Sequence, residues 1–359
     1  MAVEVWNSED RRVVLTPGEV TGAVGDSVTV LPIVVAVAAL TELRLPVLLL
    51  GFALFQVVWG LRYGVPVSVE PMKALAGLVV AGALSAPELT SAGLLAGGVL
   101  LALGTVGAIG WLADFVGEPV VRGVQLSVAL ILARTGLDLG VAAPATATLA
   151  VGVAAVAVAL GYRRASALVV LALGVGLAGL DVGVPSPGLP ALSPGVPLAF
   201  TSDGLAATAG QLAMTVGNAA VATSLLISDL FDADVSPDEL ATSMGAMNLL
   251  AVPFGAMPMC HGSGGVAGKY AFGARNAGAN LVLGLLSAVS ALAAADLGAA
   301  GPPAALGGVL ALAAVGLGKA GLNTERRWLA VGVGVLGLLT NVGIAFVVGV
   351  GLDRLRNKL

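Results

Sequence analysis

The chain has 359 residues, of which 58% are hydrophobic and only 11% charged, and its mean hydropathy is +1.01. A soluble domain typically carries about 25% charged residues, and a soluble fold of this length cannot hide so much apolar surface, so the composition excludes a soluble protein and predicts a polytopic membrane protein. The net charge is −4, and no basic patch is interleaved with aromatic residues, so nucleic acid is not an expected partner.

The first 20 residues are charged and polar, and we expect residues 1–20 to form a cytoplasmic N-terminal segment. They lack the apolar stretch and the small-residue cleavage site of a secretory signal peptide. The first membrane segment is therefore expected to act as its own insertion signal. The single cysteine, Cys260, rules out an internal disulfide.

Apolar segments follow one another along the rest of the chain, and about 20 apolar residues cross a bilayer as a helix. In the first half, full spans or shorter half-spans are predicted at 24–42, 46–62, 71–84, 91–112, 119–136, 144–160 and 166–182. A stretch with five prolines follows, and residues 184–204 are expected to be an extracellular linker. In the second half, spans are predicted at 206–229, 240–256, 262–274, 279–296, 303–318, 327–340 and 342–353.

The distribution of basic residues supports seven plus seven segments. With the N-terminus inside, only Arg44 and Arg134 fall in outside loops and Lys73 lies within the membrane. Inside loops receive the other basic residues: Arg11, Arg12, Arg62, Arg122, Arg163, Arg164, Lys269, Arg275, Lys319, Arg326, Arg327, Arg354, Arg356 and Lys358. This bias follows the positive-inside rule and predicts a multi-pass protein of the cell membrane with both termini cytoplasmic.

Two short polar motifs interrupt the apolar pattern at matching places of the two halves. Glu70-Pro71-Met72-Lys73 follows the extended run Val65–Val69, and His261 to Gly265 follows the run Met257–Cys260. Each motif then opens a shortened apolar helix. Seven spans per half place the halves in opposite orientations, which is the inverted-repeat plan of many secondary transporters. The predicted fold is an all-α polytopic membrane protein of about 14 segments, arranged as 7+7 inverted repeats with broken half-helices at segments 3 and 10.

A helix that begins at membrane depth presents free backbone N–H groups and the positive end of its dipole to its surroundings. Such a break is costly unless it lines a cavity. The two motifs therefore predict a site for an anion between the starts of the half-helices. In the run Gly262-Ser263-Gly264-Gly265, Ser263 and the neighbouring backbone N–H groups are candidate ligands, because a helix N-terminus needs no net charge to hold an anion. The alternative is a glycine cluster that lets helices pack closely.

Lys73 is the strongest candidate for binding the anion, because a lysine within the membrane is rare. The alternative is a structural ion pair with Glu70, three residues earlier. Glu70 is itself a candidate proton carrier. His261 is either a donor or proton relay, or a packing residue whose ring is already hydrogen-bonded.

Polar residues of the first span in each half complete the candidate site. Gln211, Thr215 and Asn218 are spaced by four and three residues and share one helical face, which lines the cavity or bonds to neighbouring helices. Asp26, with Thr29, lies near the predicted start of the first span, where it caps the helix or serves in coupling.

At these residues the chain resembles the MOT-type molybdate transporters, relatives of the SulP sulfate permeases with a uracil-permease-like fold. The resemblance runs from about residue 19 to 284. The stretches that carry it are Gly25-Asp26 with Thr29 and Pro32, Pro71-Met72-Lys73-Ala74, Val120 to Leu126, Gln211-Leu212 with Thr215 and Asn218, Asp229-Leu230-Phe231, Met247-Asn248, Phe254 to Gly265, and Phe272-Gly273-Ala274-Arg275. The family usually has a glutamine where this chain has Glu70.

The resemblance implies a secondary active transporter of a tetrahedral oxyanion, with molybdate as the first candidate and sulfate or tungstate close behind. Such a transporter acts within a lipid bilayer, needs no cofactor and is expected to form a homodimer. The resemblance also implies a transport core that moves against a gate. Residues 21–113 and 205–297 would form the core, and residues 114–183 and 298–359 the gate. Met72, His261 and Gly262 to Gly265 enter the candidate binding site with this motif match.

Other functions remain open at this point. A transporter of the same fold for a carboxylate or a nucleobase is favoured by Glu70, since a neutral ring can donate hydrogen bonds to a carboxylate. An anion channel would use the same site without coupling. An enzyme is not expected, because the chain has one histidine, no His-Glu metal spacing and no Gly-x-Ser-x-Gly turn.

Overall fold

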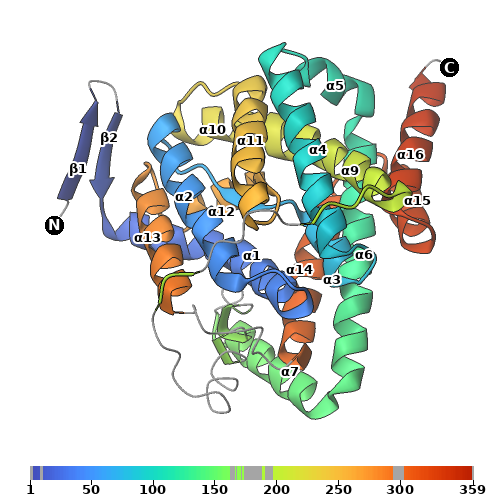
Figure 1. The fold of residues 1–359 in the computed structure, drawn as a ribbon, viewed down its shortest axis with the longest axis horizontal. Coiled ribbons are helices and arrows are strands. Elements are labelled where there is room, and N and C mark those ends of the chain that lie inside the picture. The colour runs from blue at the N-terminus through green and yellow to red at the C-terminus, as the bar shows by residue number, and fades with distance from the viewer. Residues whose placement is uncertain are drawn as a thin grey trace.

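The computed structural model describes residues 3–8, 11–161, 166, 168–170, 172–173, 188–190, 197–293 and 303–357. Most of them are helical (Figure 1). The first half contains β1 (Val3–Ser8), β2 (Arg11–Leu15), α1 (Pro17–Leu40), α2 (Leu45–Tyr63), β3 (Val69–Pro71), α3 (Lys73–Val80), α4 (Ala86–Thr105), α5 (Ile109–Val116), α6 (Glu118–Ala142) and α7 (Pro144–Ala159).

The second half begins with one helix of three parts, in which the π-helix η1 (Thr215–Ala222) joins α9 (Ser202–Met214) to α10 (Thr223–Phe231). It continues with α11 (Pro237–Ala251), η2 (Val252–Phe254), β4 (Met259–His261), α12 (Ser263–Ala271), α13 (Gly278–Ala293), α14 (Pro303–Gly321), α15 (Arg327–Leu339) and α16 (Val342–Asn357). Both halves therefore contain long helices, then a three-residue strand, then a short helix and a longer one.

Local sequence signals fix where several helices begin. Ser85 and Ser236 each form a capping box, with a proline in the first turn and a glutamate three residues after the serine. Thr16 and Thr201 cap α1 and α9 through their hydroxyl groups. These caps satisfy backbone N–H groups that a helix start leaves without partners.

The predicted spans agree with the helices in place but not always in extent. Among the described residues, four helices are long and apolar enough to cross a membrane: α2, α4, α6 and the helix Ser202–Phe231. Helix α1 adds a fifth if its two parts, which are bent by 41°, are taken together. The predicted span 91–112 is wrong at its end, because α4 stops at Thr105 and α5 starts at Ile109. Most of the predicted segment 166–182 lies outside the described residues. The count of fourteen stays a prediction.

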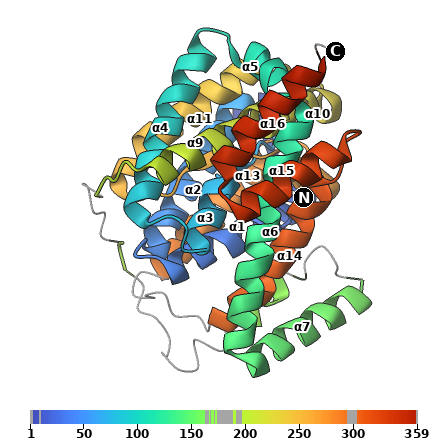
Figure 2. The ribbon, with the colours of Figure 1, turned by 90° about the vertical axis from the view of Figure 1, so that its right-hand side faces the viewer.

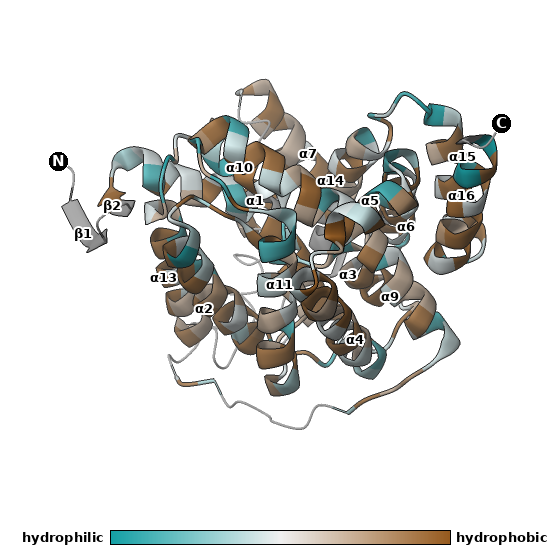
Figure 3. Ribbon diagram, turned by 90° about the horizontal axis from the view of Figure 1, so that it is seen from above, coloured by the Kyte–Doolittle hydropathy of each residue, from teal (hydrophilic) through white to brown (hydrophobic). Residues whose placement is uncertain are grey.

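Helices from the two halves are interleaved (Figures 1 and 2). Helix α4 packs against α11, α2 against α13, and α1 against α12, while α6 packs against both α14 and α15. Apolar residues predominate on the helices and hydrophilic ones gather mostly at their connections (Figure 3). Large apolar side chains such as Leu54, Leu225 and Val347 are exposed on the outside of the bundle, as in a protein surrounded by lipid.

The N-terminal segment contains structure that the sequence analysis missed. Strands β1 and β2 form an antiparallel hairpin, which lies at one end of the molecule in Figure 1. Helix α1 follows it at once, and the buried Glu19 carboxylate accepts hydrogen bonds from the backbone N–H groups of Arg275, Asn276 and Ala279. Glu19 thus holds the start of α13, so the block Phe272 to Arg275 is explained by packing between the two halves.

Candidate functional site

The two predicted breaks meet in a two-stranded antiparallel sheet. Strand β3 pairs with β4, with Val69 opposite His261, Glu70 opposite Cys260 and Pro71 opposite Met259. Helices α3 and α12 start two residues after these strands end, and they have 8 and 9 residues. At 1.5 Å per residue each is about 12–14 Å long, less than half of a bilayer's roughly 30 Å hydrocarbon core. The two predicted short helices are present, each after a short strand. Strand β3 overlaps the predicted extended run Val65–Val69 only at Val69, and β4 overlaps the run Met257–Cys260 at its last two residues.

Protein groups satisfy the backbone around this sheet. The amide of Asn248 on α11 bonds to both the N–H and the carbonyl oxygen of Met259, each at 2.7 Å, as a neighbouring strand would. The Met72 N–H donates to the carbonyl oxygen of Pro258 at 2.9 Å. These bonds offset the cost of non-helical backbone among transmembrane helices.

The start of α3 is closed by a side chain from the second half. The Oε1 atom of Gln211 accepts hydrogen bonds from the backbone N–H groups of Ala74 (2.9 Å) and Leu75 (3.3 Å). The Nε2 atom of Gln211 donates to the hydroxyl of Thr215 at 2.9 Å. The predicted polar face of α9 and η1 therefore does reach the first half-helix.

The start of α12 is more open. The Ser263 hydroxyl donates to Oδ1 of Asn218 on the π-helix at 2.8 Å. Gly264 is exposed, and a Cβ atom added to it would meet nothing within 4 Å. The same polar face of the second half thus contacts both half-helices, Gln211 at α3 and Asn218 at α12.

Glu70 lies directly against the buried side of this helix start. A Cβ atom added to Gly262 would fall on the Glu70 carboxyl group, and one added to Gly265 would fall on Oε1 of Glu70, on Oδ1 of Asp26 and on the Ser68 hydroxyl. Only glycine at these two positions allows both carboxylates to approach the helix. This close approach agrees with the packing alternative for the glycine cluster.

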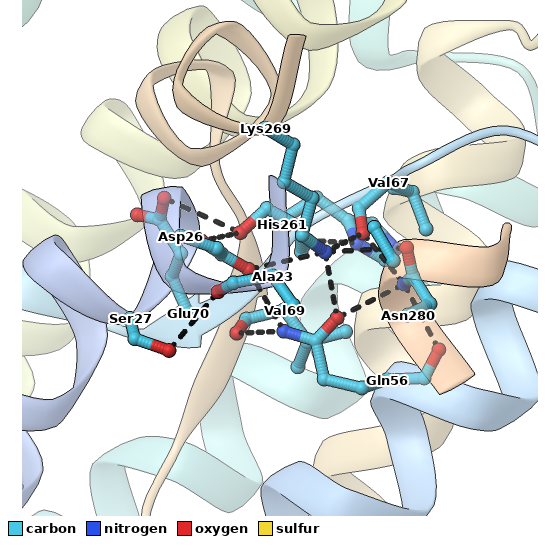
Figure 4. Close-up of polar contacts among 12 residues, drawn as sticks. Ala23, Asp26, Ser27, Gln56, Val67, Val69, Glu70, His261, Lys269 and Asn280 are labelled. Carbon is cyan, nitrogen blue, oxygen red and sulfur yellow. Dashed lines mark hydrogen bonds and ion pairs between the residues drawn. The ribbon is translucent and has the colours of Figure 1, made fainter. Parts of the chain in front are cut away.

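Four charged side chains form two ion pairs near the sheet, and the pair of Asp26 and Lys269 can be followed in Figure 4. Lys73 is paired with Glu70, as the structural alternative for these residues predicted; the Lys73 side chain is 15% exposed and that of Glu70 1%. Lys269 on α12 is paired with Asp26 on α1, with Nζ and Oδ2 3.1 Å apart and both side chains fully buried. The Ser68 hydroxyl donates to Oδ1 of Asp26 at 2.6 Å and lies 3.4 Å from Oε1 of Glu70, which links the pairs.

Two expectations about this second pair are wrong. Asp26 does not cap the first span, because α1 begins nine residues earlier at Pro17 and Thr16 provides its cap. Lys269 does not lie in an inside loop, since it is fully buried within α12. Lys269 falls inside the predicted span 262–274, and this position already indicated that it lies within the membrane rather than in a loop. Gly25 and Gly268 bring the two helices together, since a Cβ atom on Gly25 would lie 2.9 Å from the carbonyl oxygen of Gly268.

His261 points away from the face of the sheet that carries Glu70 and Cys260, because neighbouring residues of a strand alternate in direction. Its Nδ1 lies 2.9 Å from the carbonyl oxygen of Ser68 and its Nε2 2.8 Å from the hydroxyl of Ser243. The ring also packs edge-on against Trp59 and Tyr63. This geometry matches the packing alternative for His261.

The other predicted site residues differ in how accessible their side chains are to solvent. The side chains of Lys73, Asn218 and Ser263 are partly accessible, whereas that of Met72 is fully buried in the hydrophobic core. Thr29 lies within α1, but its side chain is outside the described part of the chain. Among the described residues, no group of three or more histidine, cysteine, aspartate or glutamate side chains is placed to hold a metal ion.

The arrangement of the helices is that of known membrane transporters. The chain superposes with a TM-score of 0.67 on the transmembrane domain of the cyanobacterium bicarbonate transporter BicA, at 19% identity, covering 92% of this chain and 97% of that one. It superposes with a TM-score of 0.68 on the murine Solute Carrier 26 family member A9 (Slc26a9) anion transporter in the inward-facing state, at 14% identity, covering 98% of this chain and 69% of that one. The chain therefore shares the fold of these two structures.

The sequence comparisons identify the family of the chain. The model of the family described as "Molybdate transporter of MFS superfamily" matches residues 18–132 and 203–317, and the chain belongs to this family. Molybdate transporter 2 of Arabidopsis thaliana is 31% identical over 325 residues, 74% of this chain and 70% of that protein. Molybdate transporter 1 of the same plant is 30% identical over 330 residues, 76% of this chain and 72% of that protein. The chain is thus a transporter rather than an enzyme, and the predicted resemblance is confirmed.

Proposed function

We propose that this chain carries a tetrahedral oxyanion across the cell membrane, with molybdate as the first candidate and sulfate and tungstate as close competitors. The names of its relatives support molybdate. The observation that carries the proposal is the pair of short helices that start at one buried two-stranded sheet, with a partly accessible lysine at the first and open glycine backbone at the second.

The anion would bind between these helix starts. Lys73 would supply positive charge, and Ser263, Asn218 and the backbone N–H groups at Gly264 would replace the hydration of the oxyanion. Gln211 and Thr215 would hold the first helix in place, and Met72 and His261 would support the site from the protein interior. Gly262 and Gly265 would keep the second helix close to the sheet.

Glu70 is the proposed carrier if transport is coupled to protons. Its carboxylate is paired with Lys73 and lies against the start of α12, so it repels an arriving dianion. Protonation of Glu70 would remove this repulsion and release the Lys73 ammonium to the substrate. Uptake of molybdate into liposomes should therefore be faster with an inward proton gradient. Equal uptake with and without the gradient would exclude this mechanism.

Alternating access would come from motion of a core against a gate. The core would comprise residues 21–113 and 205–297, and the gate residues 114–183 and 298–359. The packing of α6 against α14 and α15, and of α4 against α11, supports two such groups. One family model matches two stretches of equal length, residues 18–132 and 203–317, which supports a repeat, and we propose that its two copies are inverted. Cytoplasmic termini and a homodimer complete the proposal.

The proposal is tested by titrating purified protein with molybdate, sulfate and tungstate. Molybdate should bind most tightly, and Lys73→Ala should weaken its binding by at least tenfold, the equivalent of about 1.4 kcal/mol. Arg134→Ala is the matched control, since Arg134 is a surface residue whose side chain is 73% exposed. Tighter binding of a carboxylate or of uracil would favour a carrier for those solutes, and uncoupled anion currents would favour a channel.

A further inference from the structure

The ammonium group of Lys269 is surrounded by oxygen atoms from four separate parts of the fold (Figure 4). Its Nζ atom lies 3.1 Å from Oδ2 of Asp26, 3.0 Å from Oε1 of Gln56, 2.7 Å from the carbonyl oxygen of Val67 and 3.2 Å from Oδ1 of Asn280. Lys269, Asp26, Gln56 and Asn280 are all buried. These four oxygen atoms are called the oxygen cage below.

The cage is built to hold a positive charge. An ammonium group has three N–H donors, so it cannot give each of the four oxygens its own hydrogen bond, and charge attraction must hold part of the set. The amide nitrogens of the same two residues tie the cage oxygens together. Nε2 of Gln56 donates to Oδ2 of Asp26 and to the carbonyl oxygen of Val69, and Nδ2 of Asn280 donates to Oε1 of Gln56 and to the carbonyl oxygen of Val67. These bonds fix both amide groups with their oxygens toward the ammonium.

We propose that Lys269 is a tethered cation seated in a site that fits a free monovalent cation, so that removal of its side chain creates a binding site for such an ion. One carboxylate, two amide oxygens and one backbone carbonyl are hard oxygen ligands that suit hard cations. The distances of 2.7–3.2 Å exceed the roughly 2.3–2.6 Å of Ca²⁺ and the roughly 2.0–2.1 Å of Mg²⁺. An ion of the size of ammonium or K⁺ fits the cage best, and Na⁺ fits after a small contraction.

The consequence for transport rests on the proposed function. Because the charge in the cage is covalently attached, the native chain needs no free cation at this place. Anion uptake by the native protein should be the same in K⁺, Na⁺ and choline salts of equal ionic strength. In a variant without the lysine, uptake should depend on the ion that occupies the cage.

The test uses full-length protein carrying Lys269→Ala, purified in KCl and exchanged into KCl, NH₄Cl, NaCl or choline chloride at equal ionic strength. The melting temperature of the variant should rise by about 3 °C or more when K⁺ or NH₄⁺ replaces choline, since a ligand that binds only the folded state stabilises it. The native protein and Lys269→Met, whose side chain fills the vacated space without a charge, should show no such rise.

Two results would overturn the proposal. One is a Lys269→Ala protein that folds and melts at the same temperature in all four salts. The other is a Lys269→Ala protein that folds in none of the four salts, while the double variant Asp26→Asn/Lys269→Ala does fold. In that case the unpaired Asp26 carboxylate prevents folding, whereas a cation bound in the cage would have compensated its charge. These readouts need no transport, so a failure of the proposed function, seen as absent oxyanion binding in the native protein, is distinguished from a failure of the cage.

Discussion

The ion pair of Asp26 with Lys269 and that of Glu70 with Lys73 lie side by side, joined by Ser68, and differ in almost every other respect. In the pair of Asp26 and Lys269 both side chains are completely inaccessible, and the lysine is surrounded by protein oxygens. In the pair of Glu70 and Lys73 the lysine is 15% exposed, and the carboxylate lies next to an open helix start.

The difference in accessibility separates a structural ion pair from one that can interact with a substrate. A charge that has several protein partners and no access to solvent can exchange nothing with a substrate, whereas a partly accessible charge with a single charged partner can change partner when an anion arrives. The Asp26 pair fixes α12 against α1, and the Glu70 pair is placed to respond to the substrate. The predictions below test this separation, from the largest expected effect to the smallest.

The largest effect is expected from breaking the inaccessible pair. Asp26→Asn or Lys269→Met should each lower the free energy of unfolding by about 3–5 kcal/mol, because each leaves one buried charge uncompensated. The double variant should recover a large part of that loss, since it leaves no unpaired charge. Thermal unfolding in detergent compares the native protein, the two single variants and the double variant, in choline chloride so that K⁺, Na⁺ and NH₄⁺ are absent. A double variant as unstable as the sum of the singles would show that the pair is not coupled.

The next largest effect is expected where the two pairs meet. Gly265→Ala places a Cβ atom on both carboxylates and on Ser68, and such overpacking costs about 1–3 kcal/mol. Gly264→Ala, one residue away, has open space around it and should be close to neutral in stability. Thermal unfolding compares the two. Equal losses would mean that the helix start, rather than the carboxylates, is what the substitution disturbs.

A change in function without a large change in stability is expected from Glu70→Gln. The variant keeps the shape of the side chain and leaves Lys73, which can reach solvent, without its charged partner. Removal of the like charge should strengthen molybdate binding about tenfold and abolish the effect of a proton gradient on uptake. Calorimetric titration and liposome uptake measure the two effects. If the affinity for molybdate is unchanged and uptake still depends on the proton gradient, a residue other than Glu70 carries the proton.

The smallest effect is expected at the second half-helix. Ser263→Ala removes one hydroxyl that can bond to the anion, which should weaken binding by about 1 kcal/mol, or roughly fivefold. Ser243→Ala is the matched control, because Ser243 bonds to His261 on the other face of the sheet and should leave affinity unchanged. The same titration measures both. A larger loss at Ser243 would move the functional site to the histidine side.

Part of the site was predictable because it is local. The half-helices follow from apolar runs that are too short to span, the extended stretches from the residues before them, and the shared face of Gln211, Thr215 and Asn218 from helical spacing. The pair of Glu70 and Lys73 follows from three residues of separation. Each of these inferences concerns neighbours along the chain, whose relative positions the backbone geometry fixes.

The sequence by itself determined that the chain is a polytopic membrane protein with two broken helices, because composition and periodicity reflect the environment of each segment. Only the tertiary structure decided that Lys269 pairs with Asp26, 243 residues earlier in the chain, and in which direction the His261 side chain points. The first depends on the close packing of Gly25 against Gly268, and the second on the register of a two-stranded sheet. Both are contacts between distant segments, and a single sequence carries no local signal for which of its charges will meet.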